Sequence, residues 1–124
     1  MADEYNPHHS RMSADTLADF LRKPLSGDLR EVPGIGDKQI KLLKLGGDAS
    51  DRIYTTQQLI GKFLLLKSID ENTGMLMTSR EHCNTFARYL RHKGVTAQRA
   101  IIVQAIAERT NTMFPNTYDF VDFE

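Results

Sequence analysis

The sequence has few of the features that cross-link a chain or attach it to a membrane. Cys83 is the single cysteine among 124 residues, which excludes an internal disulfide framework and indicates a reducing intracellular compartment. Tryptophan is absent. No apolar run approaches the roughly 18 residues of a membrane-spanning helix, and the first residues do not have the form of a signal peptide. We therefore expect a soluble intracellular protein with no membrane partner.

The sequence also lacks the usual patterns of catalytic and metal sites. Neither Cys-x-x-Cys nor His-Glu-x-x-His spacing occurs. His82 precedes Cys83 directly, but neighbours on a helix do not face each other, so a buried, inert thiol is favoured over a nucleophile. The adjacent His8 and His9 point in different directions, which favours a solvated tail over a metal site. We expect no catalytic residue, no metal and no cofactor, and a small base-excision enzyme is the least favoured alternative.

Charge of neither sign dominates the chain. Lysine plus arginine and aspartate plus glutamate each number 16, so the net charge is zero. The distribution is uneven, because residues 21–107 contain 14 basic and 8 acidic residues, whereas residues 1–20 and 108–124 each sum to −3. A basic centre is compatible with a phosphate-bearing partner, although its excess is modest.

Apolar periodicity predicts an all-α domain, a compact bundle of about five to six short helices over residues 13–112. The expected helix starts are marked by N-caps at Ser13 and Thr96 and by capping boxes at Asp28/Glu31, Thr55/Gln58 and Thr78/Glu81. Prolines and glycines mark the helix ends. An exposed basic cluster is expected on the last helix turns before Gly94, formed by Arg88, Arg91, His92 and Lys93. A disordered tail is expected over 1–12 and an aromatic, acidic tail over 113–124. The expected helices cover about 14–23, 28–32, 37–45, 57–67, 78–93 and 97–112.

The expected helix over 57–67 is apolar on most sides. Leu59, Ile60, Phe63 and Leu64–Leu66 surround its axis, which predicts a central core helix, a subunit interface, or both. Gly61 costs about 1 kcal/mol relative to alanine inside a helix, so close packing against another helix is expected there.

The tail over 113–124 combines four aromatic and three acidic residues. A disordered tail usually lacks that aromatic content. Docking onto the helical domain is favoured, and a linear motif that binds a protein partner is the alternative.

The most informative segment is a turn between two helices. Leu29 and Val32 have helical spacing, and Pro33 then prevents the helix from continuing. Gly34 and Gly36 flank Ile35 and allow a tight turn before a second helix begins. Helix, Pro-Gly-Ile-Gly, helix resembles the helix-hairpin-helix motif, which binds nucleic acid without reading its sequence.

Physical chemistry suits this turn to an anion. A glycine-rich turn that opens a helix exposes backbone N–H groups at the positive end of the helix dipole. Lysines on the second helix add charge along a nucleic-acid backbone, whereas an aspartate in its first turn would repel a phosphate. A purely structural αα-turn is the alternative. The predicted DNA-phosphate-binding residues are Gly34, Ile35, Gly36, Asp37, Lys38, Lys41 and Lys44.

The order of motifs resembles a known family. Gly34-Ile35-Gly36, followed by the Gly61-Lys62-Phe63-Leu64-Leu65-Leu66-Lys67 helix, is similar to barrier-to-autointegration factor, a small five-helix DNA-bridging protein. The similarity is best over residues 24–67. The resemblance implies phosphate contacts from 34–38, a nuclear location, and a homodimer whose two hairpins hold two duplexes. The longer loop over 68–77 and both tails depart from that family.

The sequence therefore predicts sequence-non-specific binding of double-stranded DNA, with bridging by a dimer. The alternative is a protein-interaction module that uses the 57–67 helix or the C-terminal tail. In that alternative the Pro-Gly-Ile-Gly turn is only structural.

Overall fold

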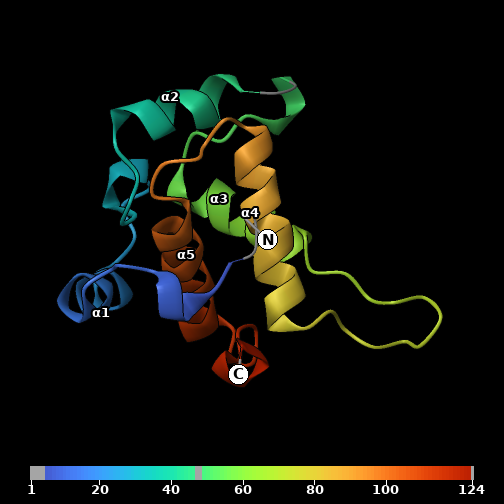
Figure 1. Ribbon diagram of the computed structural model, residues 1–124. Coiled ribbons are helices and arrows are strands. Elements are labelled where there is room, and N and C mark those ends of the chain that lie inside the picture. The colour runs from blue at the N-terminus through green and yellow to red at the C-terminus, as the bar shows by residue number, and fades with distance from the viewer. Residues whose placement is uncertain (1–4, 47–48, 124) are drawn as a thin grey trace.

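The computed structural model describes residues 5–46 and 49–123, and these ranges are helical with no β-strand. The prediction of an all-α fold is confirmed (Figure 1). The α-helices are α1 (Ala14–Arg22), α2 (Asp37–Leu45), α3 (Thr56–Leu65), α4 (Ser79–His92) and α5 (Arg99–Met113). Short 3-10 segments are η1 (Pro7–His9), η2 (Leu29–Glu31), η3 (Ala49–Asp51) and η4 (Phe120–Phe123). None of the helices in the described ranges is long and apolar enough to cross a bilayer.

Helix α5 forms the centre of the bundle and packs against α1, α3 and α4 (Figure 1). Its buried residues include Ile102, Val103 and the run Ala105–Ala107, all fully buried. Alanines within this run allow neighbouring helices to approach closely, while the β-branched residues fill the remaining space. The central helix is therefore α5 rather than α3.

Helix α3 buries one side only. Thr55 and Gln58 form the predicted capping box at its start. Leu59 and Phe63 are fully buried, whereas Leu65 is 76% exposed. The Cβ direction of Gly61 meets no atom within 4 Å, so the expected close helix contact is wrong within this chain.

The N-terminal segment that the structure describes is ordered against α4. The Tyr5 N–H donates to Oδ1 of Asn84 at 2.7 Å, and the Tyr5 ring lies edge-on to that of Phe123 with centroids 5.5 Å apart. Tyr5 is 3% exposed. The expectation of a disordered tail over 1–12 therefore fails for 5–12, and 1–4 lie outside the described residues. A single aromatic residue shows no periodicity, so its docking site is not visible in the sequence.

The C-terminal tail docks at the start of α4. Tyr118 and Phe123 are buried, and the backbone N–H of Asp119 donates to Oγ of Ser79 at 2.7 Å. In return, the Ser79 N–H donates to a carboxylate oxygen of Asp122 at 2.8 Å. The tail thus supplies an acceptor for the first turn of α4, in addition to the cap from Thr78.

Lys93 at the end of α4 is buried, although the sequence suggests an exposed basic cluster there. Its Nζ donates to the carbonyl oxygens of Gly46 and Asp51 and lies 3.6 Å from the Asp51 carboxylate. These bonds join the ends of α2 and α4. Helix α2 ends before Gly46, as predicted, while Gly47 lies outside the described residues.

Candidate nucleic-acid interface

The predicted turn after η2 is a hydrogen-bonded β-turn. The Ile35 N–H donates to the Val32 carbonyl at 3.0 Å, with Pro33 and Gly34 at the two central positions. Gly34 has a φ of +89°, which matches the residue that a type II turn requires at this point. Ile35 is 7% exposed and fixes the turn to the core.

Gly34 also lies against the start of α5. A Cβ at this position would be 3.0 Å from Cγ1 of Ile102 and 3.2 Å from the Gln98 carbonyl oxygen. Both the positive φ and this close approach require glycine. The role of Gly34 is therefore to build the turn.

Gly36 is the N-cap residue of α2 and has a different environment. Its φ of −113° and ψ of −169° suit any residue, and a Cβ would meet only Oε1 of Gln39 at 3.5 Å. The Gly36 N–H itself is taken by the Gln39 side chain at 3.0 Å. Because Gly36 has no side chain, it offers no acceptor to the first amides of α2. This helix start is open to an external acceptor.

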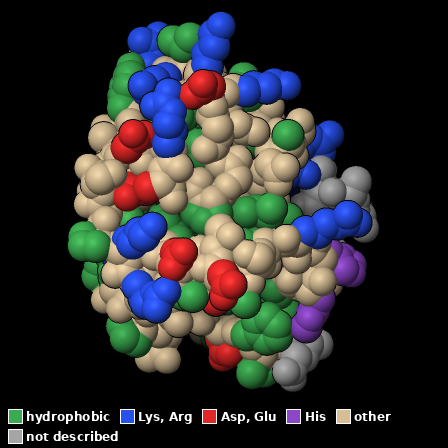
Figure 2. Space-filling model, turned by 90° about the vertical axis from the view of Figure 1, so that its left-hand side faces the viewer, with side chains coloured by type: hydrophobic (Ala, Val, Ile, Leu, Met, Phe, Trp, Pro, Cys, Tyr) green, Lys and Arg blue, Asp and Glu red, His purple; other side chains and the backbone are tan. Residues whose placement is uncertain are grey.

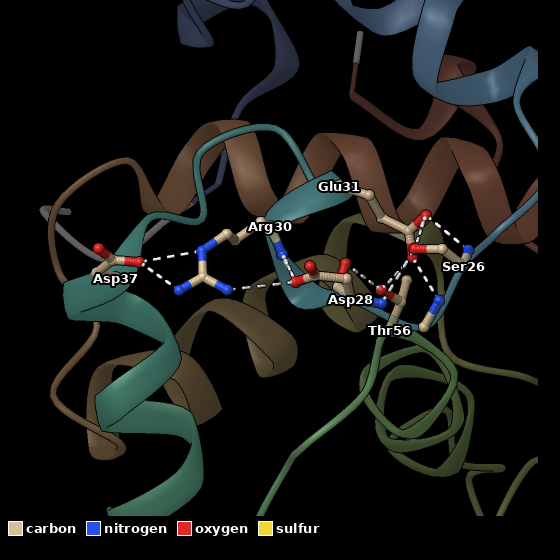
Figure 3. A network of polar contacts seen from close by, with 7 residues as sticks. Ser26, Asp28, Arg30, Glu31, Asp37 and Thr56 are labelled. Carbon is tan, nitrogen blue, oxygen red and sulfur yellow. Dashed lines mark hydrogen bonds and ion pairs between the residues drawn. The ribbon is translucent and has the colours of Figure 1, made fainter.

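Asp37, the acid in the first turn of α2, is paired with Arg30. Nε and Nη2 of Arg30 donate to Oδ1 of Asp37 at 3.1 and 2.7 Å, and Nη1 lies 3.8 Å from Asp28 (Figure 3). Both Asp37 and Arg30 are largely exposed, so the pair contributes little to stability. Its consequence is local, because the guanidinium offsets the negative charge beside the open helix start.

Glu31 does not form the capping box with Asp28 that its spacing predicts. Its carboxylate accepts the backbone N–H groups of Ser26 and Gly27 and the Thr56 hydroxyl at 2.8, 2.9 and 2.6 Å (Figure 3). Burial raises the pKa of Glu31, but these hydrogen bonds outweigh it and hold the pKa below its usual value. Glu31 thereby fastens η2 to the start of α3.

The three predicted lysines lie on the outer side of α2. Lys38 and Lys41 are exposed and Lys44 is half-buried, while Ile40 and Leu43 enter the core. Figure 2 shows Lys and Arg side chains gathered over the end of the molecule that carries α2. The lysines and the open helix start therefore lie on the same short helix, with Lys38 in its first turn.

A hollow of about 550 Å³ lies beside the turn. It is lined by residues 33–36, by Ser13 and Thr16 at the start of α1, and by Gln98 and Ile101 at the start of α5. Gln98, the N-cap residue of α5, makes no side-chain capping bond. Gly36 and Gln98, the N-cap residues of α2 and α5, thus border the same hollow and make no side-chain capping bond.

Arg11 brings a cation to this hollow and is exposed. A second hollow of about 320 Å³ shares Arg11, Gln98 and Ile101 with the first and is also lined by His9 and Arg99. Arg11 and Gln98 border the candidate site beside the turn, and Arg99 lines only the second hollow; the sequence did not predict any of the three there. These residues are distant in sequence from the turn. The N-cap predicted at Ser13 is confirmed, whereas the cap predicted at Thr96 is wrong, because Gln98 is the N-cap residue of α5.

Comparison with known proteins leaves the family open, since no family model, curated protein or solved structure matches this chain. The similarity to barrier-to-autointegration factor therefore depends on the quoted sequence motifs alone. Within the part of the chain that the structure describes, no group of three or more potential metal ligands occurs. What the geometry defines is an all-α domain with an open, basic helix start beside a sharp turn.

Proposed function

We propose that this protein binds double-stranded DNA without sequence specificity, through phosphate contacts at the turn 33–36 and helix α2. The observation that carries the proposal is the start of α2, where the N-cap residue is Gly36 and leaves the first amides without a side-chain acceptor. A phosphate oxygen is a suitable acceptor for such amides, and the helix dipole favours its charge. Lys38 and Lys41 would track the neighbouring phosphates.

The donors at this surface favour backbone binding over base reading. Amides at a helix start and flexible lysines contact phosphate oxygens, which are the same at every base pair. Arg11 and Gln98 line the hollow beside the turn and extend the polar surface past it, so adjacent phosphates could be held at once. Sequence-independent binding is the expected result.

The ion pair between Arg30 and Asp37 supports this proposal. An unpaired carboxylate in the first turn of α2 would repel a phosphate placed there. Nη2 of Arg30 lies 2.7 Å from Oδ1 of Asp37, so the guanidinium places a positive charge directly beside this carboxylate. Asp37 is therefore compatible with the site that the sequence predicts.

Self-association through α3 is part of the proposal, because bridging two duplexes requires two copies of one DNA-binding surface. Leu65 is 76% exposed, and Gly61 on the preceding turn has open space around its Cβ direction. An exposed glycine beside an exposed leucine lets a second helix approach closely. Analytical ultracentrifugation of wild type and Leu65→Lys tests this part, and a wild type that stays monomeric at the highest concentration contradicts it.

Fluorescence anisotropy with a random-sequence duplex at three salt concentrations tests DNA binding. We expect log K to fall with log salt by about 0.9 for each phosphate neutralised. The variant Lys38→Glu/Lys41→Glu should lose both affinity and slope. A charge-matched control, Lys23→Glu/Arg88→Glu, changes exposed residues outside α2 and should keep most of the affinity.

The alternative function, a protein-interaction module with a structural turn, predicts no binding at the lowest salt concentration. Equal losses in the two charge-reversal variants would also count against the proposed surface, because binding would then follow net charge alone. Circular dichroism of each variant must first show an unchanged helix content. Incubation with duplexes that contain damaged bases, followed by a search for cleavage, separately tests the enzyme alternative.

A further inference from the structure

The loop between α3 and α4 forms a protruding arm, defined here as residues 68–77. The Asp70 N–H donates to the Met75 carbonyl at 2.9 Å, and the Met77 N–H donates to the Ser68 carbonyl at 3.0 Å. Ile69 and Leu76 face each other as an antiparallel bridge. In Figure 1 the arm extends from the body on the side away from α1 and α2. A hairpin loop held by a single β-bridge is only marginally stable alone in water.

The arm exposes large apolar side chains. Ile69 and Leu76 are each 59% exposed, and Met75 is 68% exposed. In an antiparallel ribbon, the side chains of a directly opposed pair lie on the same face. Loop tips normally carry small or polar residues, so this concentration of apolar surface indicates a contact surface.

A hollow of about 510 Å³ lies between the arm and the start of α4. Its apolar lining comes from Met75, Leu76 and Met77, and its charged lining residues are Asp70 and Glu81. No lysine or arginine is among the lining residues, and neither carboxylate forms an ion pair within the described chain. The hollow is therefore apolar and negatively charged.

The helix start beside this hollow does not favour an anion. The Glu81 N–H donates to Oγ1 of Thr78 at 3.2 Å, and the Ser79 N–H donates to Asp122. Both amides thus have acceptors from the chain itself, unlike those at the start of α2. The ligand that complements the hollow is cationic and apolar.

We infer that the arm and its hollow, lined by Met75, Leu76, Asp70 and Glu81, bind a segment of another protein that carries lysine or arginine beside large apolar side chains. Methionine side chains adapt to different apolar partners because they are unbranched and polarizable. The two carboxylates select a cationic segment and disfavour an acidic one. This inference goes beyond DNA binding and does not depend on it, since α2 and the arm lie on different sides of the body (Figure 1).

The probe for this inference is a labelled synthetic peptide of about 14 residues with leucine and lysine at helical spacing. Binding to the full chain is followed by fluorescence anisotropy, with a leucine–glutamate peptide of the same pattern as the control. The leucine–lysine peptide should bind and the leucine–glutamate peptide should not. Asp70→Asn/Glu81→Gln should weaken binding by at least about fivefold, because two ion pairs are lost. The amide oxygen introduced at position 70 can still accept the N–H groups of Asn72 and Thr73, which Oδ1 of Asp70 accepts at 2.8 and 3.3 Å.

Two further variants separate the hollow from general charge attraction. Met75→Ser/Leu76→Ser removes exposed apolar surface only and should weaken binding by about tenfold or more. Asp15→Asn/Asp19→Asn removes two exposed carboxylates from α1 and should leave binding unchanged. Circular dichroism checks that each variant is folded.

Three results would overturn the inference. The first is equal binding of the two peptides. The second is the same loss of affinity in the α1 variant as in Asp70→Asn/Glu81→Gln. The third is a wild type that self-associates but does not bind the peptide, together with loss of self-association in Met75→Ser/Leu76→Ser. In that case a second copy of this chain would be the occupant of the arm.

Discussion

Gly34 and Gly36 are two residues apart in one turn, but only Gly34 has a backbone conformation that strongly favours glycine. Gly34 has a φ of +89° and would bring a Cβ within 3.0 Å of Ile102. Gly36 has an extended backbone, and a Cβ there would make only an ordinary contact with Gln39. One glycine therefore shapes the turn, and the other leaves the start of α2 open.

Gly34→Ala is expected to destabilise the protein by about 1–3 kcal/mol, because alanine must adopt a positive φ and crowd the start of α5. Urea denaturation followed by circular dichroism measures this change in the free energy of unfolding. Gly36→Ser is the matched control and should change stability by only a few tenths of a kcal/mol, since serine and glycine are both accepted at an N-cap. Equal losses in the two variants would contradict the separate roles.

Gly36→Ser is expected to weaken DNA binding while the fold is kept. The serine hydroxyl would accept an amide N–H of the first turn of α2 and take the place of a phosphate oxygen. A loss of about tenfold is expected, comparable to one hydrogen bond to a charged group. Anisotropy with the random duplex measures it, and wild-type affinity in this folded variant would show that phosphate does not approach Gly36.

The sequence predicts the turn but cannot separate its two glycines. The Pro-Gly-Ile-Gly pattern shows that the chain bends between two helices, and the boundaries of α2 follow from Asp37 and Gly46. The conflict between Gly34 and Ile102 depends on how α5 packs, which no local pattern contains. The same reason hides Arg11, because its place beside the turn is set by tertiary packing of α1 and α5.

The helices themselves are predictable where amphipathic spacing and caps agree. Ser13, Thr55 and Thr78 are N-caps at the predicted places. Which of α3 and α5 forms the centre of the bundle is not predictable in this way, because both segments are apolar and tertiary packing decides between them. Burial of Lys93 likewise follows from two carbonyl groups in a different part of the chain.

The burial of His82 predicts that the protein loses stability when the pH is lowered. It is fully buried against Phe63, with ring centroids 3.9 Å apart and Nε2 2.5 Å from the Phe63 carbonyl oxygen. Burial lowers the pKa of His82, and this outweighs the hydrogen bond to Phe63, which raises it. The unfolded chain, with a histidine pKa of about 6.5, therefore binds the proton more readily than the folded chain.

The direction in which stability changes with pH follows from this difference in pKa. Stability from neutral His82 is complete above about pH 6.5 and falls as the pH drops toward the lowered folded pKa, by at most about 1.4 kcal/mol per pH unit. Urea denaturation between pH 7.5 and 5 measures the slope. His82→Gln keeps an N–H donor for Phe63 and should flatten it, whereas the exposed His92→Gln should not. Equal slopes in wild type and His82→Gln would contradict this assignment.

Lys93→Met is expected to destabilise the protein by about 2–4 kcal/mol. Methionine keeps the apolar stem but leaves the Gly46 and Asp51 carbonyl oxygens without their donor and the Asp51 carboxylate without its buried partner. Lys62→Met is the matched control, because Lys62 also pairs with Asp51, at 3.3 Å, but its side chain is 23% exposed against 3% for Lys93. The control should cost less than about 1 kcal/mol, since a partly solvated pair is weak. If the two variants lose the same stability in urea denaturation, burial of the Lys93 ammonium is not what joins α2 to α4.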